Sequence, residues 1–481
     1  PGLDAIRGCV VHSDVAQRGH FECGNELINR LQHAVLWTES GNLHGIPTDC
    51  PQRDERMGWL NDMTVRAEEA NYNFDVNRLH NKWIADIHDE QDPQNGAIPD
   101  TAPYRFGSRP ADPVTMCYLI VPWMLYQHYG SPEAIGAHYE GFKAWVDYLT
   151  SRTRNDIVQF SYYGDWSPPV AESMHTSEGP TPVSAHTPGT LMSTGYYYWG
   201  SKLVAQMARL LGRADDAEVY NAQAERIASA FCATFWDEQK RVFGSGNQAC
   251  CAFPLYIGIV PQTLVQTVAQ TLASDVEAHD CHLTTGNLCS KYVLEMLSAH
   301  GRHDLAWKIA TQTTYPSWGY MLANGATTIW ERWENSKETT MHSKNHPMMA
   351  TFSAWFYRYL AGIRLAPQAV GFDQFVIQPN LCEELANASA SIETVRGRVE
   401  SAWKRKGDDI TLHVRVPVNC SARISVPKPQ RDAFGIYESG KLLWRAGRKA
   451  GQVDDIGIAK DEDKCVSFSV GSGSYEFETR D

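Results

Sequence analysis

Apolar side chains recur at helical spacing through most of the first 360 residues. Phe142, Trp145, Val146 and Leu149 form one such stripe. The segment from Met116 to Tyr129 is apolar nearly all round, which is typical of a helix inside a protein. Similar spacing predicts helices near residues 25–35, 63–73, 76–88, 203–211, 219–235, 262–273, 288–300, 303–313 and 347–360. The pattern indicates about a dozen helices with few strands between them.

A ring of paired helices, the (α/α)6 barrel, fits these helices better than a solenoid, because no fixed sequence period repeats along the chain. We therefore expect a mainly α protein whose barrel spans residues 23–364. After Leu365 apolar and polar residues alternate, as they do from Ile410 to Val416. Residues 365–481 are predicted to form an antiparallel β-sandwich.

The first 22 residues have a different character. Cys9 to Val15 has the composition of a strand and lies between Gly8 and Gly19. We expect residues 1–22 to be the end of an upstream β domain or a linker. No signal-peptide pattern opens the chain, and both a cytoplasmic and a secreted location stay open.

Charge and composition narrow the classes of partner. The 481 residues carry a formal net charge of -13, which argues against nucleic acid and against an anionic membrane surface. The longest apolar run, Met116 to Tyr126, is well short of the roughly 20 residues of a membrane span. The 15 Trp and 21 Tyr suit carbohydrate recognition, although large cores use such rings too. A carbohydrate substrate is the expected partner, and the oligomeric state stays open.

Acidic and aromatic residues gather in two segments, residues 47–62 and 325–333. The first has four carboxylates, together with Trp59 and the backbone-restricting Pro47, Pro51 and Gly58. Rigid carboxylates beside a flat aromatic ring suit a sugar site. The alternative is a solvated polar loop, because charged residues are seldom buried unless they are paired.

Two acidic segments on one helical barrel suggest glycoside hydrolysis. This reaction needs one carboxylic acid to protonate the leaving oxygen and a second carboxylate as base or nucleophile. Glu55 is the candidate acid, since Asp49, Asp54 and Asp62 flank it and like charges raise a carboxyl pKa. Alternatively, Glu55 pairs with Arg53 or Arg56. Glu331 is the candidate second carboxylate, and its alternative is a structural pair with Arg332.

Two further residues could contact a sugar. Trp166 lies in the aromatic loop 162–168, where it could bind a ligand or pack over the barrel rim. His346 precedes Pro347 and could hydrogen-bond a hydroxyl or cap a helix. The chain has no metal-ligand spacing, no Gly-rich phosphate loop and no nucleophile elbow. We therefore expect no metal and no cofactor.

The two acidic segments also carry a family resemblance. Residues 47–62, beginning Pro-Thr-Asp-Cys-Pro-Gln-Arg-Asp-Glu-Arg, resemble a signature of the α-L-rhamnosidases of glycoside hydrolase family 78. Tyr-Pro-Ser-Trp-Gly-Tyr at 315–320, followed by residues 325–333, resembles a second signature. Weaker matches lie at 164–166, 282–286, 345–346 and 355–362.

This resemblance implies an (α/α)6 catalytic barrel, a C-terminal β-sandwich and inverting hydrolysis of terminal α-L-rhamnose. It implies that Glu55 is the general acid and Glu331 the general base. The residues that it implies for the rhamnose subsite are Asp49, Arg53, Trp59, Asp62, Trp166 and His346. Trp330, beside Glu331, is a further substrate-binding candidate.

Two other functions stay open. A related barrel enzyme could act on rhamnose–uronate linkages of an acidic polysaccharide, by hydrolysis or by lyase chemistry, with Arg105 and Arg109 binding the uronate. A non-catalytic sugar-binding protein is the other, although the presence of both Glu55 and Glu331 argues against it. For the inverting reaction we expect a neutral Glu55, an ionised Glu331 helped by Arg332, and carboxyl groups about 6.5–9.5 Å apart.

Overall fold

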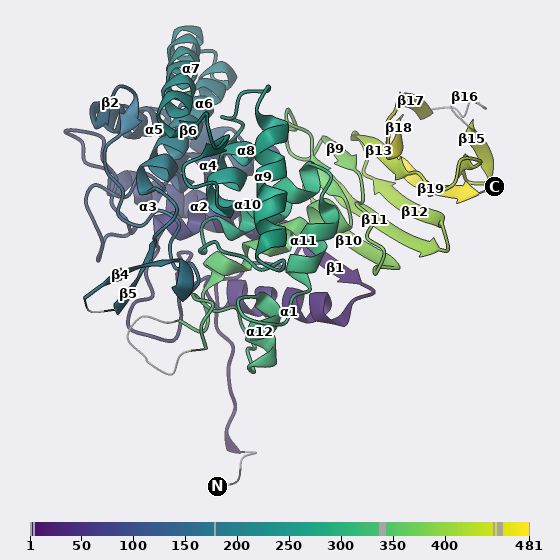
Figure 1. Ribbon diagram of the computed structural model, residues 1–481, viewed down its shortest axis with the longest axis horizontal. Coiled ribbons are helices and arrows are strands. Elements are labelled where there is room, and N and C mark those ends of the chain that lie inside the picture. The colour runs from purple at the N-terminus through teal and green to yellow at the C-terminus, as the bar shows by residue number, and fades with distance from the viewer. Residues whose placement is uncertain are drawn as a thin grey trace.

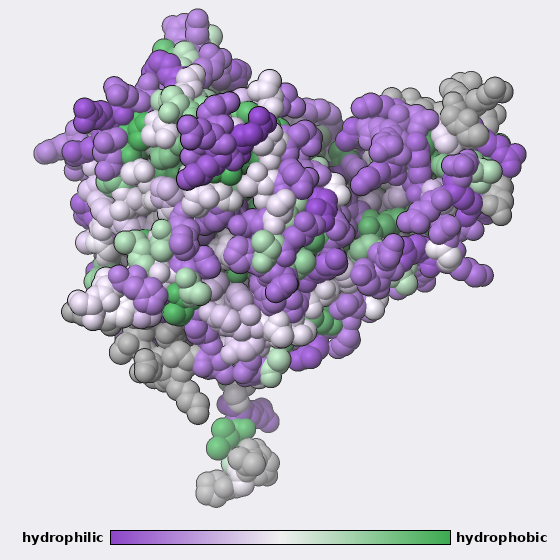
Figure 2. All heavy atoms as spheres, viewed as in Figure 1, coloured by the Kyte–Doolittle hydropathy of each residue, from purple (hydrophilic) through white to green (hydrophobic). Residues whose placement is uncertain are grey.

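The computed structural model describes residues 2, 5–177, 179–335, 343–445, 448–449 and 456–480. Helices make up the larger body of the molecule, and strands form a second body at the C-terminal end (Figure 1). The face seen in Figure 2 is largely polar, with apolar side chains scattered over it. Within the described part of the chain, no helix has both the length and the apolar composition to cross a membrane.

Six helical segments pack side by side in a closed ring. Contacts run around it in the order α2 (Leu60–Asn73), α4 (Cys117–Tyr129), α6 (Gly189–Leu210), α8 (Gln248–Ile257), α10 (Ser290–Ala299) and the 3-10 helix η3 (Pro347–Phe352), which contacts α2 again. The short helix α13 (Ser353–Trp355) and the π-helix η4 (Phe356–Leu360) continue η3. Most side chains of these segments are buried, as expected for helices surrounded by others.

An outer helix accompanies each inner segment in sequence. These outer helices are α3 (Asn77–Asp89), α5 (Glu133–Ser151), α7 (Ala214–Phe235), α9 (Val265–Ala278), α11 (His303–Ala310) and, beside η3, α1 (Glu26–Ser40). A short extra helix, α12 (Trp318–Ala323), packs on α1. The six helix pairs confirm the predicted (α/α)6 barrel. Helix α8 had no predicted counterpart, because the run around Cys250 and Cys251 is uniformly apolar and shows no period.

The C-terminal strands form two sheets. The larger sheet has the order β1-β10-β11-β12-β19-β14-β15-β16, and the smaller one has the order β17-β18-β13-β9-β8. The strands are β1 (Gly19–Cys23), β8 (Ile363–Leu365), β9 (Gln374–Ile377), β10 (Asn387–Thr394), β11 (Gly397–Lys406), β12 (Asp409–Val416), β13 (Ser421–Pro427), β14 (Gly435–Glu438), β15 (Lys441–Arg445), β16 (Arg448–Lys449), β17 (Ile456–Asp461), β18 (Cys465–Val470) and β19 (Gly473–Arg480). Phe468 and Phe477 stack between the sheets with ring centroids 5.5 Å apart, which confirms the sandwich. Among the described strand pairs of this sandwich, only β9 with β13 runs parallel.

The predicted strand from Cys9 to Val15 is wrong. Residues 9–15 have no regular structure, and Val10 and Val11 are exposed. The strand is instead β1, which begins at Gly19 and pairs antiparallel with β10 of the C-terminal sheet. A strand needs a neighbour to satisfy its backbone groups, and the edge of β10 supplies one only to residues 19–23.

The β-sandwich is attached to the last inner segment of the barrel. On β11, the indole Nε1 of Trp403 donates to the carbonyl of Leu360 at 2.8 Å, and the Ser401 hydroxyl donates to the carbonyl of Ala361 at 2.6 Å. Among the described residues, the barrel loops carry three two-stranded hairpins: β2 (Thr153–Arg154) with β3 (Ile157–Val158), β4 (Ser173–Thr176) with β5 (Gly179–Ser184), and β6 (Trp236–Asp237) with β7 (Val242–Phe243).

A buried ion cluster joins three inner segments of the ring. Lys291 of α10 lies 3.0 Å from Glu295 and also contacts Glu68 of α2. Arg358 of η4 lies 2.9 Å from Glu68 and contacts Glu295 as well. Each cation therefore serves both carboxylates, which offsets the cost of burying charge.

Replacing Lys291 by Met should lower the free energy of unfolding by about 3–5 kcal/mol, because it leaves buried carboxylates without one of their cations. Urea unfolding measures the change. Lys82→Met is the matched control, since Lys82 makes the same i,i+4 pair with Asp86 on the surface. The control should cost about 0–1 kcal/mol. Equal losses in the two variants would show that the buried cluster contributes no more than a surface pair.

Candidate active site

One guanidinium brings the two acidic segments together. Nη2 of Arg53 contacts the carboxylate of Glu55 and lies 3.4 Å from Oε2 of Glu331. Arg53 and Glu55 belong to the loop between α1 and α2, whereas Glu331 lies between α12 and η3. The closed ring of helices therefore places the two predicted carboxylates at the same site, although some 270 residues separate them in the sequence.

Glu55 is held by two donors and stays accessible. Its Oε1 accepts a hydrogen bond from Nε1 of Trp59 at 2.7 Å, and its Oε2 accepts one from Arg53. The Glu55 side chain is 25% exposed, so a substrate can reach it. Asp54 points into solvent and pairs with Arg56, so it does not crowd Glu55 as the sequence suggested. Asp49 does lie close, with carboxylate oxygens of the two residues within 4.8 Å.

Glu331 is buried, and hydrogen bonds to the backbone of Ser343 hold it in place. Its N–H donates to the carbonyl of Ser343, and the N–H of Ser343 donates to Oε2 of Glu331, both at 2.9 Å. Burial raises the pKa of Glu331 to about 7, while the charge of Arg53 opposes this rise. The cation beside Glu331 is therefore Arg53, whereas the sequence favoured Arg332.

Asp49, Asp62 and His346 form a buried polar floor beside the two acids. Oδ1 of Asp49 accepts from the N–H of Met57 at 2.8 Å. Asp62, in the first turn of α2, has its Oδ1 3.2 Å from Nε2 of His346 but without hydrogen-bond alignment. Burial and the neighbouring acids raise the pKa of both aspartates, that of Asp49 to about 6, and burial lowers the pKa of His346 to about 3.

Several buried polar atoms of this floor and of the neighbouring Asn61 and Arg53 have no hydrogen-bond partner among the described residues. They are Oδ2 of Asp49, Oδ1 of Asp62, Oδ1 of Asn61 and Nε of Arg53. A buried polar group without a partner costs roughly 1–3 kcal/mol, and most such groups in native proteins are satisfied. Unpartnered groups beside Glu55 and Glu331 can hydrogen-bond a hydroxyl-rich ligand.

Aromatic rings from three loops form a wall next to the acids. Trp59 lies edge-to-face with Phe106 at 6.3 Å and with Tyr163 at 6.0 Å between ring centroids. Tyr163 in turn lies edge-to-face with Trp166 at 5.3 Å. Tyr163 and Trp166 belong to the aromatic loop 162–168 that the sequence singled out, whereas nothing in the sequence pointed to Phe106. Trp330 is not part of this wall, since it is 3% exposed and packs in the core.

Other acids near the wall are structural. Asp165 accepts from the N–H groups of Gly286 and Cys289 at 2.8 and 2.9 Å. Asp112 accepts from the N–H of Tyr163 at 2.8 Å, and Asp100 accepts from the hydroxyl of Tyr163, also at 2.8 Å. These carboxylates use their oxygens to hold the loops that present the aromatic wall.

In the loop 101–112 beside the wall, one of the two arginines is paired with an acid. Arg109 forms an ion pair with Glu90 and lies over the ring of Tyr104, 3.8 Å from its centroid. Glu90 therefore neutralises Arg109, one of the two cations considered for binding a uronate.

One group of residues in the site is close enough to hold a metal ion. Oxygens of Asp49 and Glu55 and the sulfur of Cys50 lie within 4.8 Å of one another. Burial raises the pKa of the Cys50 thiol to about 12, which opposes the thiolate form that binds metals. Arg53 already contacts Glu55 with positive charge. The donor set is therefore a poor fit for a cation.

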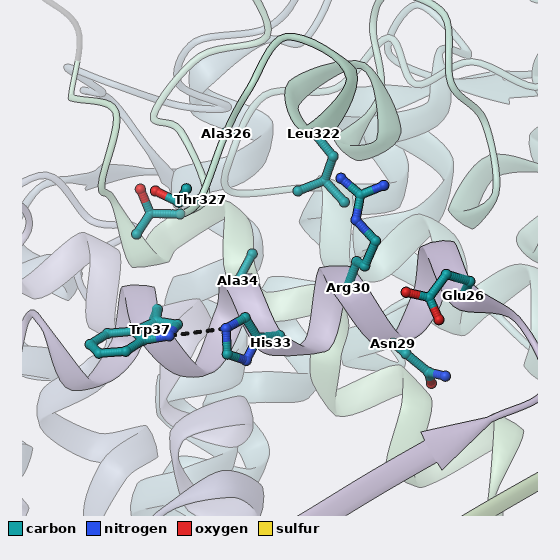
Figure 3. A pocket seen from close by; sticks show the side chains of 10 residues that line it. Glu26, Asn29, Arg30, His33, Ala34, Trp37, Leu322, Ala326 and Thr327 are labelled. Atoms are coloured by element: carbon teal, nitrogen blue, oxygen red, sulfur yellow. Dashed lines mark hydrogen bonds between the residues drawn. The ribbon is translucent and has the colours of Figure 1, made fainter.

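A separate hollow of about 600 Å³ lies on the outer face of α1 (Figure 3). His33 and Trp37 line one side, where the indole donates to His33 at 3.0 Å, and Thr327 and Leu322 line the other. Neither Glu55 nor Glu331 lines this hollow.

Comparison with known proteins agrees with this architecture. The family model of the bacterial alpha-L-rhamnosidase six-hairpin glycosidase domain matches residues 16–360, and that of the bacterial alpha-L-rhamnosidase C-terminal domain matches residues 362–440. The chain is 31% identical to an alpha-L-rhamnosidase of Streptomyces avermitilis, over 99% of this chain and 43% of the relative. It is 33% identical to one of Alteromonas sp. (strain LOR), over 92% of this chain and 48% of the relative.

Solved structures show the same likeness. The alpha-L-rhamnosidase of Dictyoglumus thermophilum aligns with a TM-score of 0.92 and 37% identity, over 100% of this chain and 52% of that one. The Streptomyces avermitilis enzyme complexed with L-rhamnose aligns with a TM-score of 0.87 and 30% identity, over 98% and 43% of the two chains. The chain spans about half the length of the curated relatives it matches. It belongs to the bacterial α-L-rhamnosidase family, as its sequence signatures predicted.

Proposed function

We propose that this chain hydrolyses terminal α-L-rhamnosyl residues from oligosaccharides, polysaccharides or glycosides, with inversion at the anomeric carbon. The observation that carries the proposal is the meeting of Glu55 and Glu331 around Arg53, beside buried polar atoms that have no partner. The structure of a relative complexed with L-rhamnose supports the choice of sugar. Membership of the family supports the reaction class.

Glu55 is the proposed general acid. It is the more exposed of the two carboxylates, so it can reach the leaving oxygen at the open side of the sugar. Arg53 and Trp59 each donate to one of its oxygens. The carboxyl oxygen that carries the proton for the glycosidic oxygen cannot also accept a hydrogen bond from a guanidinium or an indole. Substrate binding must therefore displace one of the two donors, Arg53 from Oε2 or Trp59 from Oε1.

Glu331 is the proposed general base. Its pKa of about 7 suits this role, because a base is most effective when its pKa lies near the working pH. The hydrogen bond from Ser343 fixes Oε2 and so orients the carboxylate. Glu331 would take a proton from a water that attacks the anomeric carbon, on the face opposite to Glu55.

The proposed rhamnose subsite uses the polar floor and the aromatic wall. Sugar hydroxyls would satisfy Oδ2 of Asp49, Oδ1 of Asp62 and Nε of Arg53. The ring of Trp59 and, across Tyr163, that of Trp166 would cover the apolar side of the sugar. His346 lies beside the same oxygen of Asp62 and is neutral, since burial keeps its pKa low, so it would border the sugar subsite without adding charge.

Glu55→Gln and Glu331→Gln should each lower turnover on a natural rhamnosyl disaccharide by roughly 10²–10⁴-fold. On an aryl rhamnoside with a good leaving group, Glu55→Gln should keep more activity, because such a group needs little protonation. Glu331→Gln should stay impaired on both substrates, since water attack is still required. Steady-state kinetics on the two substrates measure the difference.

Asp54→Asn is the matched control, because Asp54 adjoins Glu55 but points into solvent. It should keep wild-type turnover. Proton NMR of the first product should show the inverted anomer. A retained anomer, or near-wild-type turnover by Glu331→Gln, would refute the assignment. Ultraviolet absorbance is recorded in the same assays. A lyase acting on a rhamnose–uronate linkage would release an unsaturated product, which absorbs in the ultraviolet, instead of free rhamnose.

The pH profile should report the ionisation of Glu331. The base must be deprotonated, so kcat/KM should fall as the pH drops through about 7, where Glu331 takes up its proton. Arg53→Met removes the charge that lowers this pKa and should move the acid limb to higher pH. Arg56→Met, an exposed arginine of the same segment, should leave the midpoint unchanged. A midpoint that stays or moves to lower pH in Arg53→Met would contradict the role of Glu331.

Arg109→Ala should change kcat/KM to a similar degree on neutral and on uronate-linked rhamnosides, because Glu90 already neutralises Arg109. Paired assays on the two substrate types test this expectation. A loss confined to the uronate-linked substrate would instead show that the loop 101–112 selects an acidic neighbour sugar.

A further inference from the structure

The last turn of α1 carries buried polar groups that reach both acidic segments. The hydroxyl of Thr38 donates to the carbonyl of Ala34 at 2.6 Å and accepts from the N–H of Ile329 at 2.8 Å. Ile329 lies two residues before Glu331, and Thr38 is fully buried. One side-chain hydroxyl therefore fixes the backbone that leads into the proposed base.

Glu39, the next residue of this turn, acts on the other segment through Arg66. Oε1 of Glu39 lies 2.9 Å from Nη2 of Arg66, and Nη1 of Arg66 donates to the carbonyl of Thr48 at 2.7 Å. Both charged side chains are fully buried. Thr48 immediately precedes Asp49, so the ion pair fixes the backbone that presents the aspartate of the proposed sugar subsite.

Asn42, just after the helix, connects a third segment. Its Nδ2 donates to Oδ1 of Asn345 at 2.8 Å, and its carbonyl accepts from the N–H of Thr48, also at 2.8 Å. Asn345 precedes His346. The same helix lines the hollow of Figure 3, and Thr38, Glu39 and Asn42 are not among the residues that line it.

We propose that Thr38, Glu39, Asn42 and Arg66, here called the α1 tether, are positioning residues that set the placement of Glu331 relative to Asp49 and Glu55. This inference rests on the proposed function, since it concerns the reaction at that site. None of the four side chains is exposed enough to touch a substrate. Their effect passes through the backbones of residues 329–331, 48–49 and 345–346.

The physical basis is the steep dependence of catalysis on geometry. A displacement of about 1 Å can cost on the order of 10²-fold in rate. If the Thr38 hydroxyl is removed, the buried N–H of Ile329 loses its partner, and the backbone must shift to find another. The shift would be felt at Glu331, whose backbone and carboxylate are hydrogen-bonded to Ser343 on the other side.

The test compares Thr38→Val, which keeps the shape but removes the hydroxyl, with Thr38→Ser, which keeps the hydroxyl. On an aryl rhamnoside, Thr38→Val should lower kcat by on the order of tenfold with a smaller change in KM. Thr38→Ser should keep a kcat close to that of the wild type. Ser201→Ala is the matched control. Ser201 is also fully buried, donates to the carbonyl four residues earlier and accepts a second hydrogen bond, but it lies on α6 away from the site.

A double-mutant cycle separates positioning from stability. If Thr38 acts through Glu331, adding Thr38→Val to Glu331→Gln should cause little further loss, because the misplaced base is already absent. In the Glu55→Gln background the loss should persist. A purely structural role would lower activity in both backgrounds and would therefore overturn the proposal.

A second variant keeps the test informative if Thr38→Val does not fold. Arg66→Lys keeps the charge beside Glu39 but lacks the planar fork that also reaches Thr48. It should raise KM more than it lowers kcat, because Asp49 belongs to the sugar subsite. If the wild type is active and the folded variants have unchanged kinetics, the proposed positioning role of the α1 tether is wrong, but the proposed function stands. A wild type that releases no rhamnose would overturn the proposed function instead.

Discussion

The site depends on one arginine placed between two carboxylates. Glu331 is buried, and bringing a second carboxylate near it without a cation would cost several kcal/mol. Arg53 contacts both Glu55 and Glu331, so it offsets their repulsion and defines the distance over which they face each other. The remaining polar groups of the site lie around this contact. The arginine is therefore the central cation of the site.

The barrel makes this arrangement possible because its inner helices form a closed and densely packed ring. Chain segments that connect the helices carry the polar residues, as is common where a rigid scaffold presents functional loops. The buried ion cluster of Glu68, Lys291, Glu295 and Arg358 ties α2, α10 and η4 together within that scaffold. Asp62 and Arg66 lie on the same helix α2 as Glu68, so the scaffold and the site share an element.

The acids of this region differ in how their oxygens are used. Asp165 and Asp112 each accept hydrogen bonds from backbone N–H groups and thereby hold the aromatic loops in place. Asp49 and Asp62 keep an oxygen without a partner although they are equally buried. Satisfied carboxylates stabilise the fold, whereas unsatisfied ones leave binding capacity for a ligand. Near the proposed active site, this distinction separates Asp112 and Asp165 from Asp49 and Asp62, although Glu39 and Glu69 of the framework also keep a buried oxygen without a partner among the described residues.

Helices, strands and the two acidic segments could be predicted from the sequence, because helical and strand periods and short motifs are local properties of the chain, and the family resemblance implied the closed barrel. The sequence did not show that residues 19–23 join the C-terminal sheet, that Phe106 and Tyr163 extend the aromatic wall, or that α8 is a helix. The pairing of Glu331 with Arg53 rather than Arg332, and the exposure of Asp54, became visible in the folded protein alone. Ion pairing and the pKa of a buried acid depend on groups brought together by closure of the ring, and such neighbours leave no periodic signal in the sequence.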